Sequence, residues 1–368
     1  AMQMIGITGT KGKTTTACML YQMLKEAGVK CGLIGTLGVR RSDGLKKPGS
    51  NTTPDALVLQ KELREMADAG CSCCVMEVSS QGLKHYRVEG ITFAIGIYTN
   101  LSMDHIGPGE HRSFREYACC KKRLFERSRM ICINADDKYH GFMTANLEAP
   151  VYTYGIEQPC DVKAEHIVYE RSSRGLNVTY QTTGWIKDEI VLKMPGTANV
   201  YNSLAAMEAA HLLGISPETI RKTLRNVSVK GRIEEVRISD KFDVVIDYAH
   251  NAASLESLIK TLRQYQPKRL VLLFGCGGNR SPLRRYQMGE TAGRLSDVTI
   301  LTSDNPRYEE PERIMQTIEE GMKETKGQYQ MMVDRKEAMR FMLAQGRPGD
   351  ILILAGKGHE QYQEIKGD

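Results

Sequence analysis

The sequence predicts an α/β protein with two large domains, and three observations lead to this prediction. Strand and helix patterns alternate along the first 135 residues, and a second alternation starts near residue 232. Strands that alternate with helices form a mostly parallel sheet with helices on both faces. The length of 368 residues exceeds what one hydrophobic core usually serves. We therefore expect an N-terminal domain over residues 1–228 and a C-terminal domain over residues 229–368.

The first domain is predicted to open with a strand, a helix and a second strand. The helix over 14–27 has apolar residues three or four positions apart and stops before Gly28. Ser113 and Glu116 have the spacing of a capping box and predict a helix that ends near residue 126. The other predicted elements are a helix over 54–69 and strands over 2–7, 29–35, 73–78, 92–99 and 130–134.

The middle of the chain changes its pattern after residue 150. Short segments of alternating polarity at 175–181 and 189–194 predict a small antiparallel insertion. A helix over 199–213 follows, and then a helix over 217–226 with Ser216 as its cap. Residues 227–231 are predicted to form a linker. The C-terminal domain is predicted to be a Rossmann-like α/β domain, with strands over 244–248, 270–274, 298–302 and 351–354.

Composition and charge argue against several classes of protein. Apolar residues make up 41% and charged residues 26%, which is typical of a globular protein in water. The net charge of +6 is spread along the chain without an aromatic-rich basic stripe, so no nucleic-acid partner is expected. No apolar run approaches the roughly 20 residues of a membrane helix, and no secretory leader is evident. Ten cysteines without zinc-type spacing suit small buried residues in a reducing cytoplasm.

A candidate phosphate loop lies between the first strand and the first helix. Glycines there let backbone N–H groups approach an anion, and the helix N-terminus adds free donors. Lys13 is predicted to neutralise the β- and γ-phosphates of ATP, and Thr14 to ligate Mg²⁺. The strict motif asks for glycine where Ile7 stands. The predicted ATP-binding residues of this P-loop ATPase domain are Gly9, Thr10, Lys11, Gly12, Lys13, Thr14 and Thr15.

Glu77 and His105 follow two different predicted strands. Glu77 lies at the end of the strand over 73–78, and His105 comes after the strand over 92–99. The carboxyl ends of parallel strands face the ligand crevice of such a sheet. We therefore expect Glu77 and His105 to share a divalent ion. Each residue taken alone is better explained as a surface carboxylate or a structural histidine.

Ordered runs along nearly the whole chain resemble the Mur ligase family. Within that family they are most similar to the MurE type, which adds the third amino acid to UDP-N-acetylmuramoyl-L-Ala-D-Glu. The matching runs are Thr8–Thr14, Thr52–Leu57, Met76–Ser80, Thr99–His105, Lys121–Phe125, Gly196–Asn202, Gly231–Arg232, Asp247–His250, Asp304–Arg307 and Gly356–Glu360. Their number and order make the resemblance specific.

The resemblance implies ATP-dependent formation of an amide bond. ATP phosphorylates a substrate carboxylate, and the amine of the incoming amino acid attacks the resulting acyl phosphate. Because the transition states are rich in negative charge, cations and fixed donors dominate such catalysis. The resemblance assigns catalytic roles to Lys13, Glu77, His105, Lys121 and Arg232.

The resemblance also implies two Mg²⁺ sites and a modified lysine. Thr14 and Glu77 resemble ligands of the Mg²⁺ on ATP, and Glu77 and His105 resemble ligands of a second Mg²⁺. Lys121 matches the position that the family carries as a carbamate. A carbamate supplies oxygen ligands to a hard cation, whereas an ammonium would repel it. A buried lysine with a lowered pKa can react with CO₂.

Further contacts with ATP and with the two other substrates follow from the resemblance. Asn199, His250 and Arg285 match positions that contact the adenine, ribose or phosphates of ATP, and Arg232 matches a residue that faces the phosphates. The muramoyl peptide is expected to contact Thr52, Thr53, Ser79 and Arg87. The amino acid is expected to contact Asp304, Asn305, Arg307, Gly356 and Glu360.

Arg307 is the residue that predicts which amino acid is used. In MurE-type enzymes that use meso-diaminopimelate, this arginine pairs with the distal carboxylate, and a planar guanidinium suits that geometry. Enzymes that use L-lysine generally lack it, so diaminopimelate is favoured over L-lysine. The alternative is that Arg307 is an ordinary solvated arginine of a loop.

The match to the MurE type fails at three places. The family carries a UDP-binding domain ahead of the phosphate loop, and we expect it to be absent here, either removed or missing from a natural short form. Gln81 replaces the usual histidine, and the run 106–111 differs from the family pattern.

Two other functions stay open on the sequence alone. One is a Mur-like ligase of another pathway, of the cyanophycin or poly-γ-glutamate type, that acts without a UDP-sugar. The other is a regulatory module that binds ATP without ligation. For the leading hypothesis we expect a monomeric cytoplasmic enzyme without a membrane partner.

Overall fold

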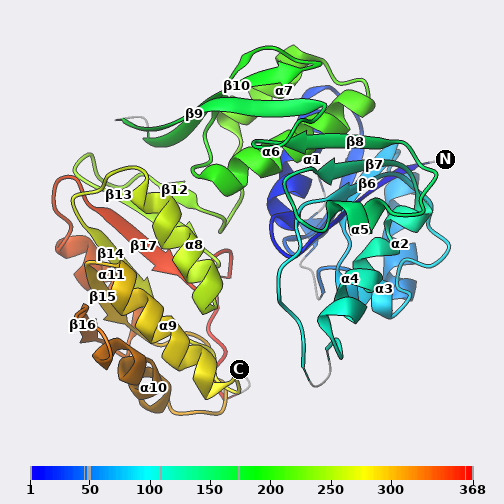
Figure 1. Cartoon of the computed structure of the whole chain (residues 1–368). Coiled ribbons are helices and arrows are strands. Elements are labelled where there is room, and N and C mark those ends of the chain that lie inside the picture. The colour runs from blue at the N-terminus through cyan, green and yellow to red at the C-terminus, as the bar shows by residue number, and fades with distance from the viewer. Residues whose placement is uncertain are drawn as a thin grey trace. The chain divides into compact units, whose positions relative to one another are not determined.

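The structure is a computed structural model that describes residues 2–44, 46–47, 51–107, 110–172, 175–360 and 362–366. The chain forms two compact units that divide between Val227 and Ser228 (Figure 1). The first unit contains Ala1–Val168, Val178–Lys193 and Thr197–Val227, and the second contains Tyr169–Asn177, Met194–Gly196 and Ser228–Asp368. Two short segments that we placed in the N-terminal domain, 169–177 and 194–196, therefore group with the second unit.

The main sheet is built from strands β1 (Gln3–Thr8), β2 (Cys31–Gly35), β3 (Gly38–Arg40), β4 (Lys46–Lys47), β5 (Cys73–Glu77), β6 (Phe93–Tyr98), β7 (Ser128–Asn134), β8 (Val151–Gly155), β9 (Val162–Ser172), β10 (Gly175–Gly184) and β11 (Glu189–Leu192). Over the described residues their order is β11-β10-β9-β8-β7-β6-β1-β5-β2-β3-β4. β1 pairs in parallel with β5 and β6, which confirms the predicted parallel sheet. The predicted strands of this parallel part are present with bounds that differ by at most two residues.

The predicted antiparallel insertion extends the main sheet and does not form a sheet of its own. β8 pairs with β9 in parallel, and β10 pairs with β11 antiparallel. Along β9 and β10, more buried and more exposed side chains alternate. This period of two belongs to strands with one covered face. β9 was not among the predicted segments, and β10 continues three residues beyond the predicted segment 175–181.

Helices cover both faces of the main sheet, as the sequence predicts. They are α1 (Lys13–Glu26), α2 (Ala56–Asp68), α3 (Ser80–Lys84), α4 (Phe114–Lys122), α5 (His140–Thr144), α6 (Thr197–Leu212) and α7 (Pro217–Asn226). On one face α1 and α6 pack against each other and against the strands. On the other face, Met4 of β1 shares a core with Met66 of α2 and Tyr117 of α4.

Two predicted helix caps are confirmed. The Ser113 hydroxyl accepts the N–H of Glu116 at 3.2 Å, and the Ser216 hydroxyl accepts the N–H of Thr219 at 3.3 Å. The helix that starts after Ser113 ends at Lys122, and a 3₁₀ turn over Phe125–Arg127 follows it.

The second unit is a separate α/β layer structure. Its strands are β12 (Glu234–Val236), β13 (Asp243–Asp247), β14 (Leu270–Phe274), β15 (Val298–Leu301), β16 (Gln328–Met331) and β17 (Ile351–Ala355), in the order β12-β13-β17-β14-β15-β16. All pair in parallel except β12, which confirms the predicted Rossmann-like domain. Its helices are α8 (Ala252–Arg263), α9 (Pro282–Leu295), α10 (Pro311–Lys323) and α11 (Arg335–Ala344).

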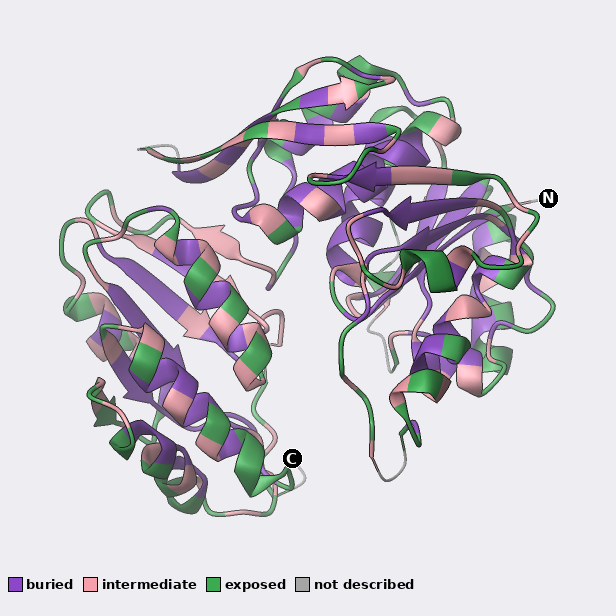
Figure 2. Cartoon of the chain, viewed as in Figure 1, coloured by how far each residue is buried: buried purple, intermediate pink, exposed green. Residues whose placement is uncertain are grey.

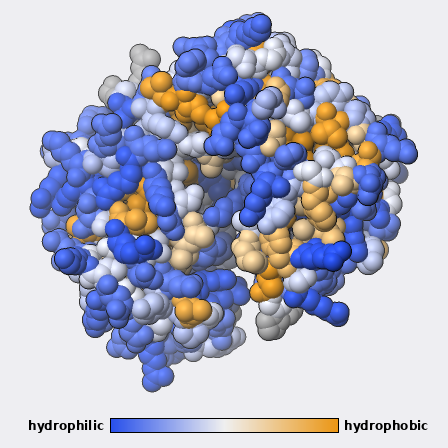
Figure 3. Space-filling view, in the orientation of Figure 1, coloured by the Kyte–Doolittle hydropathy of each residue, from blue (hydrophilic) through white to orange (hydrophobic). Residues whose placement is uncertain are grey.

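The helices of the second unit are amphipathic. In α8 the buried residues are Leu255, Leu258, Ile259 and Leu262, which lie on one face of a helix. Figure 2 shows the result as buried and exposed stripes along this helix, beside strands that are mostly buried. On the visible face, hydrophobic side chains form small patches within a mainly hydrophilic surface (Figure 3). Across the described part of the chain, no helix is long and apolar enough to cross a membrane.

Candidate active site

The loop between β1 and α1 requires glycine at two positions. Gly9 and Gly12 have positive φ angles of 152° and 88°. A Cβ at Gly9 would lie 1.9 Å from the Thr99 hydroxyl, and one at Gly12 would lie 2.3 Å from Asn202 Oδ1. The backbone conformation and these neighbours therefore leave no room for a side chain. Ile7, which breaks the strict motif, is a fully buried residue of β1.

The first turn of α1 is open to an anion. It has Gly12 at its N-cap, no side-chain cap and no acidic residue. The N–H groups of a first helical turn and the positive end of the helix dipole favour a phosphate at this position. Lys13 Nζ donates to the carbonyl oxygens of Gly9 at 2.9 Å and Thr10 at 3.1 Å. The predicted phosphate-binding lysine thus lies over the loop.

Thr99 and Asn100, which follow β6, form hydrogen bonds with the backbone of the phosphate loop. The Thr99 hydroxyl donates to the Lys11 carbonyl at 2.6 Å, and Asn100 Nδ2 donates to the same oxygen at 3.0 Å. The Lys11 N–H in turn donates to Asn100 Oδ1 at 2.9 Å. Neither role was predicted, although carboxyl ends of adjacent parallel strands meet at one edge and β6 lies beside β1.

Asn199 of α6 is connected to the same loop through Asn202. Asn199 is 4% exposed, and its Oδ1 accepts from Asn202 Nδ2 at 3.0 Å. Asn202 Oδ1 accepts from the Thr16 hydroxyl at 3.4 Å. The structure therefore brings Asn199, a predicted ATP contact, to the start of α1.

Glu77 is held at the carboxyl end of β5 by two threonines. Its Oε2 accepts from the Thr14 hydroxyl at 2.8 Å, and its Oε1 accepts from the Thr36 N–H at 2.8 Å. Glu77 is 2% exposed, and a Cβ at Gly35 would lie 2.2 Å from its Oε1. The Thr36 hydroxyl also lies 3.1 Å from that of Thr52, so it joins two predicted site residues. Thr36 was not predicted, but it follows β2 at the same edge of the sheet.

Three of the residues predicted to contact the muramoyl peptide form one hydrogen-bonded group with Asp55. The Thr53 hydroxyl accepts the Ser79 N–H at 2.9 Å, and Thr53 O accepts from Arg87 Nη1 at 2.9 Å. Arg87 Nε also pairs with Asp55 at 2.9 Å. The group fixes one edge of the guanidinium at the carboxyl end of β5.

Lys121 is a buried amine beside the phosphate loop. It is 1% exposed, its Nζ donates to the Gly9 carbonyl at 2.8 Å, and it lies 4.5 Å from the centre of the Tyr117 ring. Burial, together with the nearby charge of Lys13, holds the pKa of Lys121 well below its ordinary range. The Tyr117 hydroxyl lies 3.0 Å from the Thr10 hydroxyl, so this unpredicted tyrosine joins α4 to the loop.

Of the predicted magnesium ligands, Thr14 and Glu77 are in direct contact and His105 is not in contact with them. The hydroxyl of Thr14 and the carboxylate of Glu77 lie together, and such oxygen ligands fit a hard cation. His105 Nδ1 instead lies 3.0 Å from Glu110 Oε1, and the His105 side chain is 48% exposed. Among the described residues, no group of three or more His, Cys, Asp and Glu side chains could hold a metal ion. His105 therefore stays a predicted ligand.

In the second unit, four loops meet at the carboxyl edge of the sheet. They follow β13, β14, β15 and β17 and line a cavity of about 90 Å³. The polar lining includes four arginines and two carboxylates, namely Arg280, Arg284, Arg285, Arg307, Asp304 and Glu360. Arg280 and Arg284 were not predicted. Arg280 ends a Gly-rich turn over 275–280 that follows β14.

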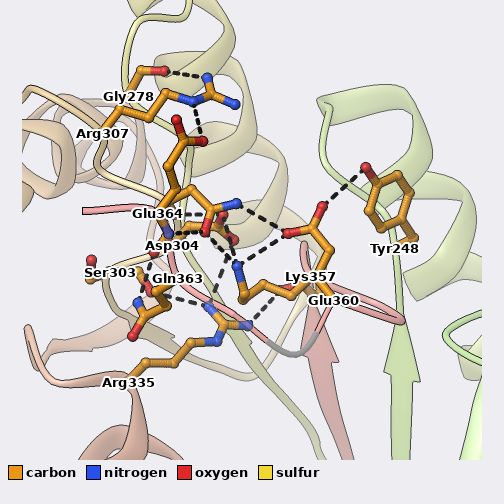
Figure 4. A network of polar contacts seen from close by, with 12 residues as sticks. Tyr248, Gly278, Ser303, Asp304, Arg307, Arg335, Lys357, Glu360, Gln363 and Glu364 are labelled. Carbon is orange, nitrogen blue, oxygen red and sulfur yellow. Dashed lines mark hydrogen bonds and ion pairs between the residues drawn. The ribbon is translucent and has the colours of Figure 1, made fainter. Parts of the chain in front are cut away.

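The predicted amino-acid contacts form a polar network around this cavity (Figure 4). Asn305 Nδ2 donates to Glu360 Oε2 at 3.1 Å, and Lys357 Nζ donates to Asn305 Oδ1 at 2.7 Å. Gly356 has a φ of 104°, and a Cβ there would lie 3.0 Å from Asp304 Oδ2. The structure thus gathers the predicted residues and adds Lys357 to them.

Arg232 and His250 both contact Tyr248. The Arg232 guanidinium lies 4.7 Å from the centre of the Tyr248 ring, and His250 Nδ1 lies 3.0 Å from the Tyr248 carbonyl oxygen. Asp247 at the end of β13 is half-buried, loss of water around its carboxyl raises its pKa, and it accepts the N–H of Ile233 at 2.8 Å. This hydrogen bond fixes the loop that carries Arg232.

Arg285 is engaged by a carboxylate that was not predicted. Its Nη1 and Nη2 donate to the two Glu309 oxygens at 2.8 and 2.7 Å, and Arg285 is 4% exposed. A bidentate pair of this kind fixes the plane of the guanidinium. Arg285 lines the cavity of the second unit, and its contact with ATP stays a prediction.

Both units match the Mur ligase family. The family models for the Mur ligase middle domain and for the Mur ligase, glutamate ligase domain match residues 7–210 and 231–358. A UDP-N-acetylmuramoyl-L-alanyl-D-glutamate–2,6-diaminopimelate ligase of Caldanaerobacter subterraneus subsp. tengcongensis is 42% identical over 365 residues, which cover 99% of this chain and 74% of that protein. The ligase of the same name from Geobacillus thermodenitrificans is 40% identical over 380 residues, which cover 100% and 76%. A solved structure of a ligase of this name is 32% identical with a TM-score of 0.72, and the match covers 100% of this chain and 75% of that one.

Proposed function

Because the chain belongs to the Mur ligase family, we propose that it is an ATP-dependent ligase that joins 2,6-diaminopimelate to UDP-N-acetylmuramoyl-L-alanyl-D-glutamate. The observation that carries the choice of amino acid is Arg307 at a cavity lined by four arginines. Diaminopimelate has a distal carboxylate that a guanidinium can bind through two N–H groups. L-Lysine lacks that distal carboxylate, so its binding would leave the Arg307 guanidinium without an anionic partner.

The first step proposed is transfer of the γ-phosphoryl group of ATP to the substrate carboxylate. A carboxylate oxygen attacks the γ-phosphorus, the bond to the bridging oxygen of ADP breaks, and an acyl phosphate forms. The N–H groups at the start of α1 and the Lys13 ammonium stabilise the negative charge of the transferring group. When bound, Mg²⁺ would neutralise the phosphate oxygens, and Thr14 and Glu77 would hold it.

In the second step, the amine of the amino acid attacks the acyl carbon. The new C–N bond forms as the C–O bond to phosphate breaks, and the amine loses a proton. Asn305, Lys357 and Glu360 are placed to orient the amino acid, since they already form one hydrogen-bonded group. Within this proposal, Lys121 would carry a carbamate, and Lys121, Glu77 and His105 would hold a second Mg²⁺ when it is bound.

The test is phosphate release by the full chain in the presence of ATP and Mg²⁺. We expect release only when both UDP-N-acetylmuramoyl-L-alanyl-D-glutamate and meso-diaminopimelate are present, with little activity when L-lysine replaces the latter. Release that is unaffected by either substrate would overturn the ligase proposal and favour an ATP-binding regulatory module. Equal or better use of L-lysine would overturn the assignment of the amino acid alone.

Arg307→Ala tests the residue behind the choice of amino acid. Loss of a charge-assisted contact to the distal carboxylate should raise the KM for diaminopimelate about 100-fold and change the KM for ATP less than about threefold. Steady-state kinetics with each substrate varied in turn gives both values. Arg313→Ala, at an exposed arginine of α10, is the matched control and should behave like the unchanged protein. An unaltered KM for diaminopimelate in Arg307→Ala would contradict the assignment.

A further inference from the structure

Arg307 has an unusual backbone that a second segment of the chain holds in place. It is not a glycine, yet its φ is 54°, a conformation that side chains disfavour. The Arg307 N–H donates to the carbonyl of Glu364 at 3.0 Å, and the Lys366 N–H donates to the carbonyl of Arg307 at 2.7 Å. These two bonds form a parallel bridge between Arg307 and Ile365. The bridge compensates for the disfavoured backbone and fixes where the side chain starts.

The guanidinium of Arg307 is fixed at two of its five N–H donors. Nε donates to Glu364 Oε2 at 2.9 Å, and Nη1 donates to the Gly278 carbonyl at 2.8 Å (Figure 4). The other three donors, both of those on Nη2 included, have no partner among the described residues. A carboxylate in the cavity therefore meets a guanidinium whose plane is already set.

Glu364 contacts Arg307 but does not line the cavity. Arg307 lines the cavity of the second unit, whereas Glu364 is not among the lining residues. The Glu364 N–H donates to Asn305 Oδ1 at 3.0 Å, and Gln363 Nε2 donates to the carbonyl of Asp304 at 2.7 Å. The segment that carries Glu364 is thus bonded along the run Asp304–Arg307. The Glu364 carboxylate, which contacts Arg307 Nε and does not line the cavity, can therefore act on a ligand there through Arg307.

We propose that Glu364 is a positioning residue for Arg307, and that it sets the affinity of the enzyme for the distal carboxylate of its amino-acid substrate. The proposal rests on the proposed function and deepens it. A free arginine side chain loses rotamer freedom when it binds a carboxylate, and a guanidinium that Glu364 already orients loses less. Glu364 also offsets part of the arginine charge, so recognition depends more on the geometry of the carboxylate than on general attraction for anions.

The experiment compares Glu364→Ala, Glu364→Gln and Gln363→Ala in the full chain. Glu364→Ala should raise the KM for meso-diaminopimelate about tenfold and leave kcat and the KM for ATP within about twofold, because only the orientation of Arg307 is lost. Glu364→Gln should return that KM to within about threefold of the original, since its amide oxygen still accepts from Nε. Gln363→Ala removes a bond of the same segment without touching the Arg307 side chain, and it should leave the KM near the original.

A double-mutant cycle with Arg307→Ala separates positioning from a general effect on the fold. In the Arg307→Ala background, Glu364→Ala should add no further rise in the KM, because the two residues act as one unit. An unchanged KM in Glu364→Ala, an equal rise in Gln363→Ala, or additive effects in the double variant would each overturn the proposal. If the unsubstituted chain does not use diaminopimelate, the proposed function fails first and this inference fails with it. If it does use diaminopimelate and Glu364→Ala is silent, the inference fails alone.

Discussion

Burial decides the chemistry of Lys121. An ammonium that is 1% exposed has lost its water, and within the described part of the chain its Nζ donates one hydrogen bond, to the Gly9 carbonyl. Burial and the charge of Lys13 both hold the pKa of Lys121 well below its ordinary value. A neutral amine can attack CO₂, forming an N–C bond and releasing one proton. The neighbouring Lys122 reaches the Ala145 carbonyl at the surface and has no such environment.

Lys121→Ala should lower turnover roughly 1000-fold, because charge stabilisation at a phosphoryl-transfer site is lost. If the lysine acts as a carbamate, a short carboxylic acid such as acetate should restore part of the activity by supplying carboxylate oxygens. Phosphate release measured with and without acetate gives both results. Lys122→Ala is the control and should retain full turnover. Unimpaired turnover in Lys121→Ala would rule out the carbamate.

At the scale of elements, the Gly-rich turn after β14 packs closely against the loop after β15. A Cβ at Gly275 would lie 2.1 Å from the Thr302 carbonyl, and one at Gly278 would lie 1.9 Å from the Pro306 carbonyl. Glycine is needed here because the two backbones touch. Glu309 connects the turn to α9, because it pairs with Arg285 of α9 and also accepts the N–H of Asn279 in the turn.

Glu309→Ala should loosen this turn and weaken amino-acid binding. Removing the Glu309 carboxylate leaves the buried Arg285 guanidinium without its bidentate partner. Because Glu309 itself is partly exposed, we expect the free energy of unfolding to fall by on the order of 1–3 kcal/mol. We expect a lower thermal midpoint and a higher KM for diaminopimelate than in Glu310→Ala, which alters the adjacent exposed residue. Calorimetry and steady-state kinetics measure the two effects. Equal behaviour of the two variants would show that Glu309 does not hold the turn.

At the scale of the whole molecule, one buried carboxyl links stability to pH. Glu208 of α6 is 1% exposed, accepts the Trp185 N–H at 2.6 Å and has a pKa raised to about 7 by burial. Because the folded chain holds this proton more tightly than the unfolded chain, the contribution of Glu208 is most favourable below about pH 4.5. It is lost as the pH rises towards 7. Trp185 is the single tryptophan of the chain, so its fluorescence reports on this site.

Glu208→Gln should remove this pH dependence. The variant's unfolding free energy, relative to that of the original chain, should rise by on the order of 2–3 kcal/mol between pH 4.5 and pH 8. Urea unfolding followed by Trp185 fluorescence at several pH values measures it. Glu148→Gln, at an exposed carboxyl, is the control and should show no such trend. A constant difference between Glu208→Gln and the original chain across this range would contradict the assignment.

The sequence by itself determined the local features of the chain. Its periodicities predicted both α/β layers, and Gly9, Gly12 and Lys13 identified the phosphate loop because those residue types are needed within one turn of backbone. The hydroxyl caps at Ser113 and Ser216 were readable for the same reason, since a cap involves residues three positions apart.

Only the tertiary structure decided which distant side chains meet. Thr36 reaches Glu77 because β2 lies beside β5, and the short segments after residue 150 extend the main sheet because β9 pairs with β8. Glu364 reaches Arg307 across 57 positions of sequence. Local periodicity specifies a strand but not its neighbour, so strand order and the contacts it creates are set by packing of the whole sheet.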